Sequence, residues 1–217
     1  KICDLMRAAL KKMGAPEDLV IGIETPSLET TNELMRQCDL VLATGGGAMV
    51  HAAYSSGSPA LGVGVGNAVI TVDDTADLDA AAEKIRLSKT LDLAASCSSD
   101  NSVVLLDGIY EPMLEKLKAQ GGYLCNEEEK AALRNTLWDE ELHLNTAIVA
   151  QPPEKIAQMA GLSISEETKF FIVPEEGWGP EHPFSGEKLS VIMALYRARD
   201  IDHAIELTQN IQAYQGQ

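Results

Sequence analysis

The sequence predicts an α/β fold built on parallel strands that helices cover. Short continuous apolar runs alternate with amphipathic stretches along the chain, and continuous runs are typical of strands buried on both faces of a parallel sheet. Glycines follow two of these runs, at 45–47 and 62–66, where tight turns leave a strand. A chain of 217 residues forms one large domain or two modest ones. We expect two domains, 1–66 and 67–217, with the boundary in the second glycine stretch.

The first part of the chain alternates helix and strand. Residues 1–13 place their apolar side chains on one helical face, and Gly14 and Pro16 end this helix. The other elements that we expect before residue 67 are a strand at 19–23, a helix at 28–37, a strand at 39–43, a helix at 49–54 and a strand that starts at Ala60.

The second part continues the alternation with longer elements. Thr75 is expected to cap the first of its helices, and 174–183 is a loop rich in Gly, Pro and Glu. We expect strands at 68–72, 102–106, 146–149, 170–173 and 191–196, and helices at 77–93, 111–119, 127–138, 153–159 and 201–213.

Charge and cysteine spacing narrow the class of protein. The formal net charge of −16 argues against general nucleic-acid binding, and local donors must hold any anionic ligand. Cysteines at 3, 38, 97 and 125 form no CxxC or zinc pattern, and the sequence shows no signal peptide or membrane-length apolar stretch. We therefore expect a cytoplasmic protein with no metal site and no membrane partner. Because the chain starts at Lys1 inside an expected helix, we also expect a fragment.

Cys97 is the candidate nucleophile. It lies between Ser96 and Ser98, after a long amphipathic helix and before the apolar run 103–106. At such a junction, backbone N–H groups can favour the thiolate, which is the nucleophilic form of cysteine. A lone cysteine is also a common core residue. The residue pattern by itself leaves both interpretations open, catalysis and packing.

Two glycine clusters are candidates for an anion site. The turn 44–47, Thr-Gly-Gly-Gly, joins a buried strand to a helix N-terminus, where free N–H groups and the helix dipole can hold a phosphate. The same turn can also be purely structural. The stretch 62–66, Gly-x-Gly-x-Gly, leads into a strand and does not match the dinucleotide fingerprint GxGxxG. The first cluster is therefore the better candidate.

Seven motifs, in order along the chain, are shared with one known family. They are 43–57 (ATGGGAMVHAAYSSG), 62–67 (GVGVGN), 88–92 (SKTLD) with Cys97, 121–124 (GGYL), 145–149 (NTAIV), 183–190 (PFSGEKLS) and 196–198 (YRA). Together they resemble the CoA-acylating aldehyde dehydrogenases, which include the aldehyde dehydrogenase half of bifunctional aldehyde-alcohol dehydrogenase and acylating sulfoacetaldehyde dehydrogenase. The resemblance implies an aldehyde dehydrogenase-like α/β fold. Residues 1–66 would belong to a parallel dinucleotide-binding sheet, and 67–217 to an incomplete α/β catalytic domain.

The resemblance also implies roles for the matched residues. Cys97 would be the thiol that attacks a small aldehyde. The implied cofactor-binding residues are Thr44, Gly45 and Gly46 at the pyrophosphate, Gly64 near the nicotinamide, Glu187 at the nicotinamide ribose and Leu189 beside the ring. The cofactor would be NAD or NADP, coenzyme A would be the co-substrate, and the full-length protein would be a homo-oligomer. Val191 stands where the family usually has proline, a departure that affects the expected loop geometry more than the chemistry.

The absence of a glutamate general base distinguishes an acylating reaction from a hydrolytic one. Hydrolytic aldehyde dehydrogenases also resemble the chain, but they carry a glutamate general base in the stretch that here reads LGVGVGN, at 61–67. Without a base that activates water, a cysteine thioester survives until another thiol attacks it, and CoA is the natural candidate. The leading prediction is therefore NAD(P)-dependent oxidation of a small aldehyde to an acyl-CoA. The alternatives are a hydrolytic enzyme that gives the free acid and a catalytically silent fragment that acts as a scaffold.

Overall fold

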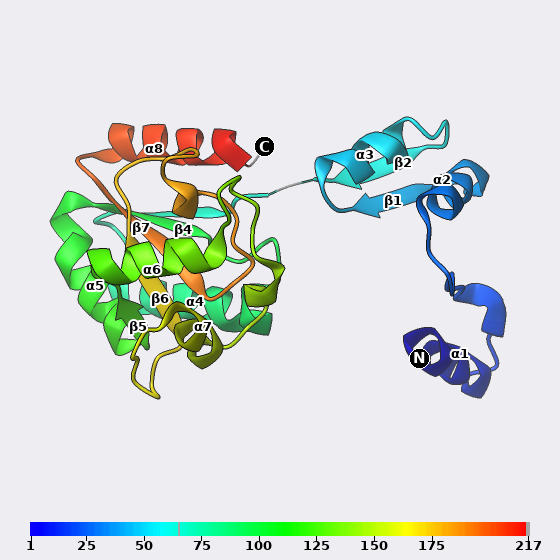
Figure 1. The fold of residues 1–217 in the computed structure, drawn as a ribbon, viewed down its shortest axis with the longest axis horizontal. Coiled ribbons are helices and arrows are strands. Elements are labelled where there is room, and N and C mark those ends of the chain that lie inside the picture. Colours follow the sequence, from blue (N-terminus) through cyan, green and yellow to red (C-terminus); the bar gives the residue numbers. More distant parts are fainter. Residues whose placement is uncertain (65, 216–217) are drawn as a thin grey trace. The chain divides into compact units, whose positions relative to one another are not determined.

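The computed structural model describes residues 1–64 and 66–215, which divide into two compact units (Figure 1). The first unit is Lys1–Gly64 and the second is Val65–Gln217. Each unit has its own hydrophobic core.

The first unit contains a small parallel sheet. β1 (Val41–Thr44) pairs with β2 (Ala60–Val63), and α3 (Gly47–Tyr54) connects the two strands. The other elements of the unit are α1 (Ile2–Lys12), a 3-10 turn at Glu17–Leu19, and α2 (Leu28–Gln37). Side chains alternate in burial along β1, because successive residues of a strand point to opposite faces.

The second unit is built on a five-stranded sheet with the order β3-β4-β7-β6-β5. All neighbouring strands are parallel. The strands are β3 (Val69–Val72), β4 (Ser102–Leu106), β5 (Gly122–Leu124), β6 (Phe170–Pro174) and β7 (Ile192–Ala198). β4, β6 and β7 are buried over most of their length, which explains why their sequences are continuous apolar runs.

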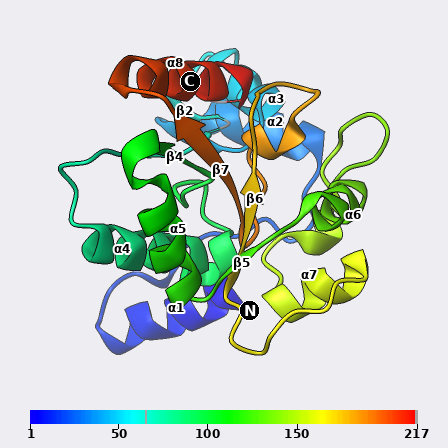
Figure 2. The ribbon, with the colours of Figure 1, turned by 90° about the vertical axis from the view of Figure 1, so that its left-hand side faces the viewer.

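Helices flank this sheet on both sides. They are α4 (Leu78–Thr90), α5 (Tyr110–Ala119), α6 (Glu127–Leu137), α7 (Pro153–Ala160) and α8 (Ile201–Gln215). Figure 2 shows α4 and α5 on one side of the sheet and α6 and α7 on the other, while α8 packs on β3, β4 and β7. None of the helices within 1–64 and 66–215 combines the length and the apolar composition that crossing a membrane requires.

Most predicted elements form, but two predicted strands are wrong. At 19–23 the chain leaves a 3-10 turn and forms no ladder, and Ile21 is 77% exposed. An apolar run becomes a strand only where another strand can satisfy its backbone groups. At 146–149 the chain makes a 3-10 turn, Thr146–Ile148, which Asn145 caps by accepting from Ala147 N at 3.0 Å.

Three further details differ from the sequence prediction. β5 was not predicted, because its three residues begin with a glycine and give no periodic signal. The helix predicted at 77–93 ends at Thr90, since the chain then turns into left-handed conformations. Its cap is Asp77 instead of Thr75: the Asp77 carboxylate accepts from the N–H groups of Asp79 and Ala80.

Candidate active site

Three loops of the second unit meet at one edge of its sheet. The segments 66–68, 91–101 and 183–191 lead into β3, β4 and β7, which are neighbours in the sheet. Because these strands are parallel, their amino ends lie at the same edge. Side-chain hydrogen bonds of Asn67 and Asn101 join the three loops.

Cys97 lies in the second of these loops. After Thr90 the chain forms a 3-10 turn, Leu91–Ala94, and residues 92–94 have φ of 47°, 54° and 57°. Non-glycine residues rarely adopt this left-handed region, and such strain is common at functional sites. The thiol of Cys97 is free and exposed, whereas Cys125 is buried and burial raises the pKa of its thiol to about 12. Exposure therefore favours the catalytic interpretation of Cys97 over the packing one.

Serine hydroxyls make hydrogen bonds within the loop of Cys97 and between this loop and α4. Ser96 Oγ and Ser98 Oγ form a hydrogen bond of 2.9 Å with each other. Further along the loop, Asp100 N donates to Ser88 Oγ at 3.0 Å, which ties the loop to the last turn of α4. The hydroxyls that flank the thiol are thus shared within the loop.

One carboxylate oxygen of Glu187 is buried inside the second unit. This oxygen, Oε1, has no hydrogen-bond partner within the described ranges. Burial raises the pKa of the Glu187 carboxyl group, and the positive charges of Lys188 and Lys89 lower it in part. A ligand that brings hydroxyl donors would satisfy this oxygen, and buried polar atoms in folded proteins are nearly always satisfied.

Two fully buried lysines, Lys89 and Lys188, lie close enough to Glu187 for their charges to act on its carboxyl group. Burial lowers the pKa of Lys89 to about 7, and the charges of Asp100 and Glu187 raise it in part. Burial also lowers the pKa of Lys188 well below its ordinary value. Lys188 Nζ donates to the carbonyl oxygens of Phe184 at 2.5 Å, Gly186 at 2.9 Å and Asn101 at 3.3 Å.

Neither of these two lysines was predicted from the sequence as part of the site. One signal was available for Lys89, because it follows Ala82 and Ile85 at helical spacing on the buried face of α4. Lys188 carried no comparable signal, since lysine is among the residues least often buried. The roles of Asn67 and Asn101 were also missed, because the carbonyl oxygens to which their side chains donate lie more than 80 residues away along the chain.

Leu189 lies two residues beyond Glu187, in the third loop. Its φ is 45°, and its carbonyl oxygen accepts from Ala150 N at 3.0 Å. The structure thus brings Cys97, Glu187 and Leu189 into loops at one edge of one sheet.

The remaining predicted cofactor residues belong to the first unit. β1 ends at Thr44, Gly45 N donates to Val63 O at 3.1 Å, and Gly46 is the N-cap of α3. A Cβ added to Gly46 would meet no atom within 4 Å, so the backbone there is open to a ligand. Gly64 directly follows β2. The turn has the strand-to-helix geometry that the sequence predicts for an anion site.

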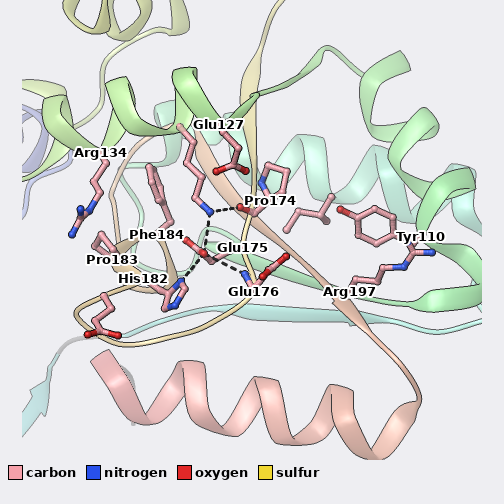
Figure 3. A pocket seen from close by; sticks show the side chains of 13 residues that line it. Tyr110, Glu127, Arg134, Pro174, Glu175, Glu176, His182, Pro183, Phe184 and Arg197 are labelled. Atoms are coloured by element: carbon pink, nitrogen blue, oxygen red, sulfur yellow. Dashed lines mark hydrogen bonds and ion pairs between the residues drawn. The ribbon is translucent and has the colours of Figure 1, made fainter.

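A pocket lies at the opposite edge of the five-stranded sheet. This pocket, of about 530 Å³, is lined by residues that include the end of β6 and the segment after it (Figure 3). At its centre the buried Glu175 Oε1 accepts from Lys130 Nζ at 3.0 Å and from His182 Nδ1 at 2.8 Å. Figure 3 shows Arg134 and Arg197 on opposite sides of this trio. None of the predicted site residues lines the pocket.

No metal site is found among residues 1–64 and 66–215, where His, Cys, Asp and Glu side chains form no group of three that could hold an ion.

Comparison with known proteins defines the class to which this fold and cysteine loop belong. The model of the aldehyde dehydrogenase family matches residues 2–128, more than half of the chain. The chain therefore belongs to the aldehyde dehydrogenase family, and the family-level prediction from its motifs is confirmed.

Two relatives match almost the whole length of the chain. The chain is 42% identical to bifunctional aldehyde-alcohol dehydrogenase of Escherichia coli K12, over 100% of the chain and 24% of that protein. It is 44% identical to acylating sulfoacetaldehyde dehydrogenase of Cupriavidus necator, over 99% of the chain and 44% of that protein. The chain thus spans less than half the length of these relatives.

Two solved structures show the same fold. An acetylating aldehyde dehydrogenase of Geobacillus thermoglucosidasius superposes with a TM-score of 0.93 at 39% identity, over 99% of this chain and 48% of that one. A propionaldehyde dehydrogenase of Rhodopseudomonas palustris, solved with bound CoA and an acylated cysteine, gives 0.87 at 28% identity, over 95% of this chain and 47% of that one.

Proposed function

We propose that the chain is the cysteine-bearing part of a CoA-acylating aldehyde dehydrogenase, which oxidises a small aldehyde to an acyl-CoA with NAD or NADP. The observation that carries the proposal is the exposed, free thiol of Cys97, in a loop at the sheet edge that also holds Glu187, whose buried Oε1 has no hydrogen-bond partner in the part of the chain that the structure describes. The relatives support it, since two of them are named as acylating or acetylating aldehyde dehydrogenases.

Cys97 forms and breaks the covalent bonds to the substrate. Its thiolate attacks the aldehyde carbon, a C–S bond forms, and the carbonyl π electrons move onto the oxygen. When the C–H bond breaks, the hydride leaves with its electron pair and the C=O bond forms again, so that Cys97 holds a thioester. The thiolate of CoA then attacks the thioester carbon, and the C–S bond to Cys97 breaks. The products are an acyl-CoA and the regenerated Cys97 thiolate.

A bound nicotinamide dinucleotide supplies the hydride acceptor, and the residues present fit it. The buried Glu187 Oε1 finds no donor among the described residues, and the two hydroxyls of a ribose can donate to a carboxylate. In the first unit, the open backbone at Gly46 and the N-terminus of α3 suit a pyrophosphate. In this proposal Glu187 holds the ribose, Thr44, Gly45 and Gly46 hold the pyrophosphate, and Gly64 and Leu189 contact the nicotinamide.

Transfer to CoA is favoured over hydrolysis by the stretch 61–67, which contains no carboxylate. A thioester on Cys97 has no general base in that stretch to activate water. The bound CoA and the acylated cysteine of the Rhodopseudomonas palustris enzyme support the same route here.

Product analysis of the intact enzyme tests the proposal. We expect sustained oxidation of the aldehyde by NAD or NADP only when CoA is present, with acyl-CoA as the product. A free acid formed at the same rate without CoA would contradict the proposal and support the hydrolytic alternative. No turnover with Cys97 intact would support a silent scaffold.

We further propose that the enzyme acts in the cytoplasm as a homo-oligomer. Light scattering of the purified intact enzyme measures the oligomeric state, and a monomeric mass would contradict this part of the proposal.

A further inference from the structure

One peptide group, between Gly186 and Glu187, is held by side chains at both of its ends. Its carbonyl oxygen accepts from Asn101 Nδ2 at 2.5 Å and from Lys188 Nζ at 2.9 Å. Its N–H donates to Gln215 Oε1 at 3.0 Å. Turning this peptide would break all three hydrogen bonds, so the backbone that carries Glu187 is fixed in orientation.

Asn101 is in turn held by Asn67. Asn101 Nδ2 also donates to Asn67 Oδ1 at 2.6 Å, and Asn67 Nδ2 donates to the carbonyl oxygens of Ser185 at 2.7 Å and Ile211 at 3.0 Å. The two asparagines are 3% and 5% exposed, so water cannot replace a lost partner. Both amides are therefore locked.

The same two asparagines hold the loop of Cys97. Asn101 follows Cys97 by four residues, and its N–H donates to Ala68 O at 2.9 Å. Gly66, the neighbour of Asn67, lies close to the loop, since a Cβ added to Gly66 would lie 3.8 Å from Cys97 O. The Asn67–Asn101 pair thus joins the loop of the thiol to the peptide of Glu187.

We propose that Asn67 and Asn101 are positioning residues for hydride transfer, which set the distance between the substrate carbon on Cys97 and the nicotinamide held through Glu187. This inference rests on the proposed function and goes beyond it. Neither asparagine touches the substrate or the cofactor in this proposal. Hydride transfer needs its two carbons within a narrow distance, and a misplacement of about 1 Å can cost roughly 100-fold in rate.

Two half-reactions of the intact enzyme separate positioning from a general structural role. Oxidation of a deuterated and an undeuterated aldehyde in single-turnover experiments measures hydride transfer. Exchange of the acyl group between acetyl-CoA and labelled CoA uses Cys97 but transfers no hydride. For Asn101→Leu we expect hydride transfer to slow about 10-fold to 100-fold, with a larger deuterium isotope effect. Acyl exchange should stay within about twofold, and the exposed Asn135→Leu is the matched control for both reactions.

The outcomes distinguish the two proposals. Equal losses of both half-reactions in Asn101→Leu would overturn the positioning role, and so would unchanged hydride transfer. A wild-type enzyme that shows no acyl exchange would instead contradict the proposed function.

A second pair of variants covers the case in which Asn101→Leu fails to fold. Gln215 lies in the last turn of α8 and holds the N–H end of the same peptide. Gln215→Leu removes the acceptor and should slow hydride transfer selectively, whereas Gln215→Glu keeps an acceptor oxygen and should restore most of the rate. Equal rates in the two variants would overturn the inference.

Discussion

At the scale of single residues, exposure separates Cys97 from the other cysteines. Cys97 is exposed, Cys3 and Cys38 are partly buried, and Cys125 is buried. The thiolate is the attacking form of cysteine and must reach the substrate. Only Cys97 combines this access with a place among the loops that hold Glu187.

The first prediction is that Cys97→Ala abolishes aldehyde oxidation. We expect a loss of more than about 10⁴-fold in kcat, since removing a catalytic nucleophile commonly costs that much. Cofactor affinity should change less than about twofold, because the thiol contributes no contact to the dinucleotide in the proposed mechanism. Steady-state rates and a cofactor titration measure the two quantities. Cys38→Ala is the control and should keep its rate; near-normal turnover in Cys97→Ala would refute the assignment.

The second prediction concerns Lys89, whose pKa falls to about 7 on folding. In the unfolded chain this amine keeps its proton up to its ordinary pKa of 10.5. Above pH 7 the unfolded state therefore binds more protons, and the free energy of unfolding rises with pH. One such group contributes a slope of at most about 1.4 kcal/mol per pH unit, and the lowered pKa of Lys188 acts in the same direction.

Urea unfolding between about pH 7 and pH 8.5 tests this slope. We expect Lys89→Met to flatten the rise relative to the wild type, while the exposed Lys84→Met on the same helix leaves it unchanged. Identical slopes in the wild type and Lys89→Met would show that Lys89 keeps its proton in the folded state.

At the scale of elements, the turn between β1 and α3 gives a clean test of the anion site. A Cβ on Gly46 meets nothing within 4 Å, and its φ of −66° suits any residue. The third prediction is that Gly46→Val leaves the fold stable and weakens NAD or NADP binding by about tenfold or more, because the new side chain blocks the approach of the phosphates. Calorimetric titration measures the affinity, with Gly108→Val in the second unit as the control. Unchanged affinity in a folded Gly46→Val variant would leave the turn a structural one.

Elements also show what local sequence can and cannot predict. β4 and β7 were predictable because both of their faces are buried, which makes their sequences continuously apolar. The run LVIGI at 19–23 looks the same, yet it forms no strand, because a strand depends on a partner elsewhere in the chain. For the candidate site, the motifs indicate Cys97 and Glu187, and the roles of both residues stay predictions. The burial of Lys188 was not predictable, since no local pattern marks it and lysine is among the residues least often buried.

At the scale of the whole molecule, the two units differ in how much core they have. In the described residues the first unit buries four hydrophobic side chains, Met35, Val41, Ala43 and Ala53. The second unit buries a contiguous cluster of 31. In the first unit the sheet face with Leu42 and Leu61 is exposed, at 72% and 58%, although parallel sheets are usually covered on both faces.

The last prediction follows from this difference. Residues 66–217 expressed alone should unfold cooperatively in urea, because their core is large enough to offset the loss of chain entropy. Residues 1–64 expressed alone should show no cooperative transition and should bind a hydrophobic dye, because four buried side chains and an uncovered sheet face supply too little burial. Circular dichroism during urea titration, together with dye fluorescence, measures both. A sharp transition in the 1–64 fragment without dye binding would show that its turns and caps stabilise it without further burial.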